Sequence, residues 1–287
     1  MATILFGNGI NRLNSNAPSW ESMLKKLEPT YTSSPNLEIP ATIQYDKIEI
    51  ISSRPSNDLL KDMCESIKGP WKNSIYERLS TLINVNFLTT NYDHTLESYF
   101  STSLKSSKRE TVYNIFSYVA TKDSQQTSKF NQSNIWHIHG DILRPKSIIL
   151  GYDHYCKEIA EIRKYIPLDF RNIARTNMST SSSLALLSGE SWIDLIFKDD
   201  IFIIGLGLGF AELDLWWLID VWSRLRKNGI VNNNIYYYDA IQQGIVDERK
   251  KSFADTLKCF MIEYILYEAS TYLEAYNMCM NDIEQRI

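Results

Sequence analysis

The sequence predicts an α/β fold in which a doubly wound parallel sheet carries helices on both of its faces. Short apolar strands alternate with longer helical patterns along the chain, which is the order that parallel strand–helix–strand units produce. The segment Ile201–Ile204 is an uninterrupted apolar run, as expected for a central parallel strand buried on both faces. Glycine-rich or polar clusters directly follow several strands, where open sheets of this kind bind ligands. Together these observations predict a Rossmann-like architecture.

Composition limits the class of protein. The chain has 287 residues, of which 44% are hydrophobic, and this is enough for a sizeable core. We expect one domain over residues 1–287, with irregular insertions near 29–57 and 101–133. The net charge of -4 argues against direct binding of nucleic acid, and no apolar run could span a bilayer. The N-terminus lacks the features of a signal peptide, so we expect a cytoplasmic protein.

The first third of the chain supplies the opening strand and a group of helices. The strand at Thr3–Phe6 is short and apolar, and the helix after it begins with Pro18 and Ser19, which favour a helix start. Four prolines make 29–57 irregular in the prediction, and apolar spacing of three and four predicts the later helices. The helices expected in this region are Pro18–Leu27, Ser56–Ile67 and Lys72–Ile83.

The rest of the chain continues the alternation. Polar stretches at 101–110 and 121–133 are expected to be surface loops, and Cys156–Ser191 to be mostly helical. The expected strands are Val85–Leu88, Ile135–Ile138, Ser147–Leu150, Ile201–Ile204, Ile235–Tyr238 and Phe260–Tyr264. The expected helices are one starting near Asp93, and Ala211–Arg226, Asp247–Lys258 and Ser270–Arg286.

The strongest candidate site is the polar stretch Thr89–Asp93, which ends the second strand. Thr90, Asn91 and Asp93 are residue types whose side-chain oxygens cap a helix, and an N-cap with a turn would explain them. The same residues stand beyond the carboxyl end of a strand, where a nucleotide would lie.

Three other strand ends carry comparable signals. Gly7-Asn8-Gly9-Ile10-Asn11 and Gly205-Leu206-Gly207-Leu208-Gly209 would let a phosphate approach the backbone, although a plain turn needs glycines as well. His139 stands before Gly140 and is either a buried strand-end histidine or a catalytic one. His137 would share its face if the strand is regular, but no third ligand has metal-site spacing, so we predict no metal.

The order of these four motifs resembles the sirtuin catalytic core, and most of all the sirtuin-like domains of prokaryotic antiviral-defence proteins. The resemblance implies that Asn91 and His139 are catalytic. It also implies that the cofactor contacts Gly7, Gly9, Asn11, Thr90, Asp93, Gly205, Gly207 and Glu212. The serine that usually follows the glycine of the later turn is absent from this sequence. Leu206 or Leu208 stands at its position, so the polar contact that the serine makes in the family has no counterpart there. The four dispersed cysteines cannot build the zinc module of sirtuin deacetylases.

What remains resembles the branch that hydrolyses NAD itself. The resemblance implies an NAD glycohydrolase with NAD as substrate and no further cofactor, acting as a regulated effector of abortive infection. A separate regulatory protein, a homo- or hetero-oligomer, or both would then control it. One alternative is a non-catalytic sensor that binds NAD or ADP-ribose and acts through a partner, and another is transfer of ADP-ribose to a protein. The residues do not distinguish NAD from NADP.

Overall fold

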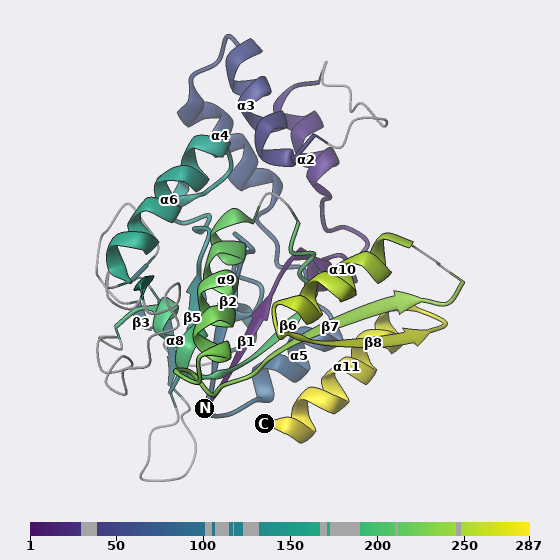
Figure 1. The fold of residues 1–287 in the computed structure, drawn as a ribbon. Coiled ribbons are helices and arrows are strands. Elements are labelled where there is room, and N and C mark those ends of the chain that lie inside the picture. Colours follow the sequence, from purple (N-terminus) through teal and green to yellow (C-terminus); the bar gives the residue numbers. More distant parts are fainter. Residues whose placement is uncertain are drawn as a thin grey trace.

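The described residues form one sheet of eight strands in the order β3-β4-β5-β2-β1-β6-β7-β8 (Figure 1). The computed structural model describes residues 1–29, 39–100, 105–106, 115–116, 118–122, 132–166, 171–172, 190–209, 212–244 and 248–287. The strands are β1 (Ala2–Phe6), β2 (Val85–Thr89), β3 (Lys105–Ser106), β4 (Val119–Lys122), β5 (Gln132–His137), β6 (Asp200–Ile204), β7 (Ile235–Gln242) and β8 (Glu263–Ala269). The six strands from β5 to β8 along the sheet are parallel, whereas β3 and β4 pair antiparallel at the β5 edge. Numbered by position in the chain, these six parallel strands have the order 3-2-1-4-5-6 of the Rossmann fold, which confirms the predicted class.

Helices cover both faces of this sheet, and the alternation of side chains along each strand gives each face its own core. In β1, Leu5 packs with the helices of one face, whereas Ile4 and Phe6 pack with those of the other. The first face is covered by α6 (Tyr152–Tyr165), α8 (Trp192–Lys198), α9 (Leu213–Lys227) and α10 (Glu248–Cys259), and the second by α5 (Ser74–Thr81) and α11 (Tyr272–Arg286). Among the described helices, none is both long and apolar enough to cross a bilayer.

The strand register brings the carboxyl ends of the parallel strands to one level. Phe6 of β1 pairs with Thr89 of β2 on one side and with Ile204 of β6 on the other. Thr89 in turn pairs with His137, and Ile204 with Tyr238. The four motifs singled out in the sequence therefore begin at the same edge of the sheet, as predicted.

A small helical layer stands over this edge (Figure 1). It consists of α2 (Trp20–Leu27), α3 (Ala41–Ile51) and α4 (Ser56–Ser66), which share a separate apolar core that includes Met23, Tyr45 and Met63. The expectation of an irregular segment at 29–57 was wrong for residues 41–51. Pro40 and Pro55 do not interrupt helices but occupy the N-cap positions of α3 and α4, where their missing N–H groups cost little.

Three further expectations differ from the structure. Within 101–133, the described residues form β3, β4 and the start of β5 rather than loops alone. Ser147–Leu150 is not a strand, because Pro145–Ser147 forms the 3-10 helix η2 and Ile149 N–H donates to the His139 carbonyl. The last strand begins at Glu263 and not at Phe260. Met261 has a φ of 62°, and the Ile262 N–H donates to the Leu257 carbonyl at the end of α10.

Candidate active site

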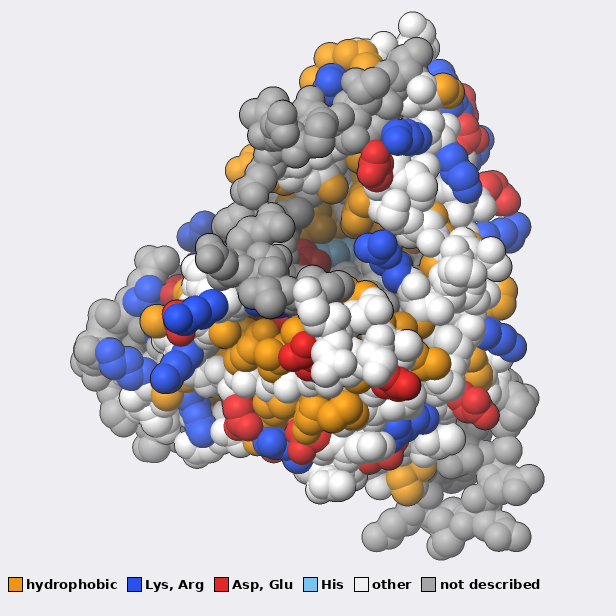
Figure 2. Space-filling model, turned by 90° about the vertical axis from the view of Figure 1, so that its right-hand side faces the viewer, with side chains coloured by type: hydrophobic (Ala, Val, Ile, Leu, Met, Phe, Trp, Pro, Cys, Tyr) orange, Lys and Arg blue, Asp and Glu red, His pale blue; other side chains and the backbone are white. Residues whose placement is uncertain are grey.

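A cavity of about 500 Å³ lies between the carboxyl edge of the sheet and the helical layer. Figure 2 shows the molecule hollowed between these two parts, with histidine and acidic side chains visible inside the hollow. Nine of the ten residues predicted from the sequence line the cavity: Gly9, Asn11, Thr90, Asn91, Asp93, His139, Gly205, Gly207 and Glu212. Gly7 does not, because it packs against Leu206, whose Cδ1 would lie 2.8 Å from a Cβ at position 7.

The two glycine turns touch each other at the point between β1 and β6. Gly9 N–H donates to the Gly205 carbonyl at 2.8 Å, and α1 (Asn8–Asn11) starts there. A Cβ on Gly9 would lie 2.7 Å from that carbonyl oxygen and 2.6 Å from the Tyr276 hydroxyl. Gly205 has a φ of 65°, a conformation that favours glycine. These two glycines are therefore explained by the packing of the protein itself.

Gly207 has no such explanation. It lines the cavity, its φ lies outside the left-handed region, and an added Cβ would meet no heavy atom within 4 Å among the described residues. The neighbouring Leu206 and Leu208 are buried in the apolar core, so they supply no substitute for the missing serine. The backbone at Gly207 is thus left open toward the cavity.

Asn91 is held at the cavity by a continuous chain of buried hydrogen bonds. Its Nδ2 donates to the Tyr76 hydroxyl at 3.2 Å, and that hydroxyl donates to Asn11 Oδ1 at 2.5 Å. Asn11 Nδ2 then donates to Asp93 Oδ2 at 2.7 Å. The chain fixes three of the predicted site residues relative to one another and adds Tyr76, which the sequence did not single out.

The Asp93 side chain also shapes the backbone that follows it. Its Oδ1 accepts from both the backbone N–H and the hydroxyl of Thr95, an Asx turn that competes with helix formation. The helix expected after Asp93 is accordingly absent from residues 93–100, where only the 3-10 helix η1 (Glu97–Tyr99) forms. Burial raises the pKa of Asp93, although its bonds to Thr95 and Asn11 oppose the shift.

His139 lies in a turn after β5 and is 2% exposed. Its Nε2 is 2.9 Å from Asp214 Oδ2, and its Nδ1 is 3.4 Å from the Tyr155 hydroxyl. Burial disfavours the imidazolium, but the Asp214 carboxylate outweighs it and raises the pKa of His139. The ring is therefore oriented by an acid from α9, a partner that the sequence did not identify.

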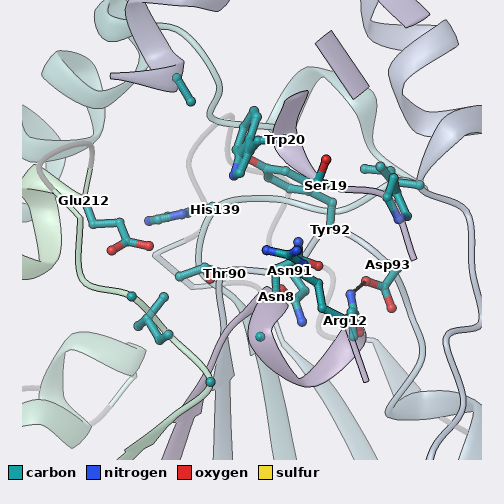
Figure 3. Close-up of a pocket in the computed structure, with 18 of the residues that line it drawn as sticks. Asn8, Arg12, Ser19, Trp20, Thr90, Asn91, Tyr92, Asp93, His139 and Glu212 are labelled. Atoms are coloured by element: carbon teal, nitrogen blue, oxygen red, sulfur yellow. Dashed lines mark hydrogen bonds between the residues drawn. The ribbon is translucent and has the colours of Figure 1, made fainter. Parts of the chain in front are cut away.

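Two glutamates, Glu212 and Glu158, also lie near the His139–Asp214 pair. Burial raises the pKa of Glu212 to about 7, with His139 opposing the shift and Asp214 adding to it. Figure 3 shows the Glu212 carboxylate beside the His139 ring. Glu158 is fully buried, neither of its oxygens has a hydrogen-bond partner among the described residues, and burial raises its pKa to about 8. The end of the cavity at His139 is thus lined and backed by acids.

His137 does not share the surroundings of His139, contrary to the expectation from a regular strand. β5 ends at His137, so the alternation of side chains stops there. His137 Nδ1 lies 2.8 Å from the Asn91 carbonyl oxygen, and its Nε2 lies 2.6 Å from Glu97 Oε1. The structure also brings His94 to this pair, so the third metal-type ligand that sequence spacing did not reveal is close in space.

Several lining residues were not singled out in the sequence. Asn8 begins α1 and Arg12 caps its C-terminal end, whereas Trp20 comes from α2 and Asp239 from β7. Arg12 is a cation on a wall whose other described charged residues are acids, and its place directly after the first glycine motif could have drawn attention to it. Asp239 binds Lys250 and the Tyr264 hydroxyl through its carboxylate.

The four cysteines lie on four different helices, α4, α6, α10 and α11, and all are free thiols. Cys64 and Cys279 are buried, whereas Cys156 and Cys259 are exposed. They contribute nothing to the lining of the cavity.

Comparison with known proteins bears on the same part of the chain. No curated protein matches it. A family model described as "SIR2-like domain" matches residues 85–194, which is less than half of the chain but runs from β2 through Asn91 and His139 to α8. Members of this family use NAD, commonly as enzymes. The match therefore supports the sirtuin-like part of the expected resemblance and indicates an NAD-related function.

Proposed function

We propose that this chain hydrolyses NAD to nicotinamide and ADP-ribose. The observation that carries the proposal is that Asn91 and His139, from the ends of two neighbouring strands, line one cavity together with both glycine turns. A Rossmann-like sheet places a dinucleotide across this edge, where its diphosphate can meet backbone N–H groups. Arg12 supplies a positive charge to the same wall.

The reaction needs few groups. The bond between C1′ of the ribose and the nicotinamide nitrogen breaks, its electron pair leaves with nicotinamide, and a water oxygen bonds to C1′. His139 accepts the proton that the water loses, directly or through a ribose hydroxyl, and passes it to solvent. Asn91 holds the ribose and the water, and its bond to Tyr76 keeps the amide in place.

The acids around His139 can stabilise the positive charge that develops on the ribose during cleavage. Cleavage passes through an oxocarbenium-like ribose, and an ionised carboxylate within the cavity stabilises that positive charge. Glu212 lines the cavity beside His139, and we assign this role to it. We assign to Asp93 the task of fixing the nicotinamide end, since it lines the same cavity on the loop that carries Asn91.

Chromatography of NAD, nicotinamide and ADP-ribose after incubation with the purified chain tests the proposal. We expect Asn91→Ala and His139→Ala to lose turnover while remaining folded. Asn57→Ala on the exposed face of α4 and His154→Ala on α6 are matched controls and should keep it. Full turnover by a folded His139→Ala protein would contradict the assignment. NAD or ADP-ribose binding without turnover would favour the sensor instead.

We further propose that activity is regulated, since free NAD hydrolysis would deplete the cell, and that the chain serves as an effector of antiphage defence. A partner protein, assembly into an oligomer, or both would control it. Sedimentation of the active sample tests this point, because a lone monomer with full activity would argue against such control.

A further inference from the structure

The buried cluster His94, Glu97 and His137 lies behind the wall of the cavity and is not part of its lining. His94 comes from the loop after β2, Glu97 from η1, and His137 from the end of β5. Each offers one ligand atom, and these atoms lie within 4.8 Å of one another. The Glu97 and His137 side chains are almost fully buried, whereas that of His94 is 22% exposed.

Hydrogen bonds on the far sides of the rings fix which nitrogens face inward. His137 Nδ1 lies 2.8 Å from the Asn91 carbonyl, which can only accept, so this nitrogen carries a proton and leaves Nε2 toward Glu97. His94 Nε2 lies 3.4 Å from Asp141 Oδ1, which leaves Nδ1 toward the same Glu97 oxygen at 3.5 Å. Metal-ligating histidines have this outer shell, in which the second ring N–H meets a carbonyl or a carboxylate.

A simple ion pair between Glu97 and His137 does not account for the whole cluster. One imidazole satisfies one carboxylate oxygen, yet the His94 ring stacks on the His137 ring at a centroid distance of 4.7 Å and presents its nitrogen to that oxygen as well. Two imidazoles and a carboxylate that converge on one point match the ligand set of a borderline divalent metal ion.

From this geometry we infer a metal site at His94 Nδ1, His137 Nε2 and the Glu97 carboxylate, suited to Zn²⁺ or a similar divalent transition ion. Ligands about 2.0–2.1 Å from tetrahedral zinc lie roughly 3.3 Å apart. The distances of 2.6 and 3.5 Å from Glu97 Oε1 to the two nitrogens bracket that spacing. Water can complete the coordination on the exposed side of His94.

The ion would have a structural task. Through His137 it would hold the carbonyl of Asn91, and through His94 and Asp141 it would tie the Asn91 loop to the segment after His139. Asp141 is anchored in turn, because its Oδ2 accepts two hydrogen bonds from Arg144. The site would therefore set the relative position of the two strand ends that line the cavity.

Zinc titration of the chelator-treated full chain, in competition with a chromophoric chelator, measures this site. We expect one tight equivalent in the unaltered chain, and a loss of affinity of at least about 10–100-fold in both His94→Ala and Glu97→Gln, since the loss of an outer-shell partner alone has that effect. His154→Ala should bind like the unaltered chain. His94 is partly exposed, so its alanine variant should fold even if Glu97→Gln does not.

Exposed Cys156 and Cys259 could bind zinc on their own, and the double variant Cys156→Ser, Cys259→Ser removes them. The expected result is that this variant keeps the tight equivalent, and that bound Co²⁺ lacks the intense near-ultraviolet band of thiolate ligands. The proposal is overturned if His94→Ala binds zinc as tightly as the unaltered chain, or if the tight equivalent disappears with the two cysteines.

Discussion

His139 Nε2 lies 2.9 Å from Asp214 Oδ2, and the Asp214 side chain is fully buried. The two residues come from opposite halves of the sheet, His139 after β5 and Asp214 from the first turn of α9. A carboxylate on one ring nitrogen fixes the orientation of an imidazole, and the other nitrogen, which lies 3.4 Å from the Tyr155 hydroxyl, remains for a proton transfer. The pair is therefore the geometric basis for assigning His139 the role of base.

Asp214→Asn should lower kcat for NAD cleavage by about 10²-fold with little change in KM. An amide keeps the shape of the side chain but no longer supports a charged imidazole, and general base catalysis contributes about 10²–10⁴-fold. Steady-state kinetics of the folded variant measures the effect. Asp220→Asn, a partly exposed position on the same helix, is the control and should leave kcat unchanged. A normal kcat in Asp214→Asn would remove Asp214 from the mechanism.

The raised pKa of Glu212 leads to a prediction of how the activity changes with pH. Burial raises its pKa to about 7, so its carboxylate forms as pH rises through 7 and can then stabilise the cationic ribose. His139 and Asp214 face this group, and their charges act on it in opposite directions. We expect kcat to rise from pH 6 to pH 8 and the rise to be smaller in Glu212→Gln. Asp58→Asn on α4 should keep the full profile, and identical profiles for Glu212→Gln and the unaltered chain would contradict this role.

The sequence predicted the framework of this site because its signals are local. Apolar runs mark the strands, and the residue that follows each run necessarily falls on the carboxyl edge once the strands are parallel. Asn91, His139 and Gly207 could be found in this way. The order of the strands in the sheet then determines which of these motifs lie next to each other.

The partners of these residues could not be found so directly, since they depend on packing between distant segments. In the sequence Asp214 is an ordinary acid in the first turn of a helix, and only the fold brings it to His139. Tyr76 reads as one apolar position of α5, and its hydroxyl meets Asn11 and Asn91 only in the fold. α3 was missed because the prolines near it were interpreted as breakers and not as helix starts.

Glu158 gives a prediction about stability. Its pKa is about 8 in the folded chain, raised by burial and by Asp214, against an ordinary value of 4.5. The folded state therefore holds a proton that the unfolded state has lost, and stability falls as pH rises from 4.5 until it passes about 8. At roughly 1.4 kcal/mol per pKa unit, this loss is about 5 kcal/mol at most.

Glu158→Gln cannot ionise, so its free energy of unfolding should increase relative to that of the unaltered chain between pH 5 and pH 9. Urea denaturation at several pH values measures the difference. Glu65→Gln, an exposed change on α4, should show no such trend. A constant difference between Glu158→Gln and the unaltered chain across this range would show that Glu158 is ionised throughout.

Three glycines of the two turns separate the needs of the fold from those of the ligand. A Cβ on Gly9 would lie 2.6 and 2.7 Å from protein atoms, so Gly9→Ala should destabilise the chain by about 1–3 kcal/mol. Gly207 lines the cavity, and a Cβ there meets no described atom within 4 Å. Gly207→Ala should therefore keep its stability, and we expect it to bind NAD about tenfold more weakly, equivalent to ~1.4 kcal/mol. Gly209 is equally open but does not line the cavity, which makes Gly209→Ala the control with normal binding. Calorimetry with NAD and thermal unfolding of all three variants measure both quantities. Equal NAD affinity in Gly207→Ala and Gly209→Ala would mean that the diphosphate does not approach this turn.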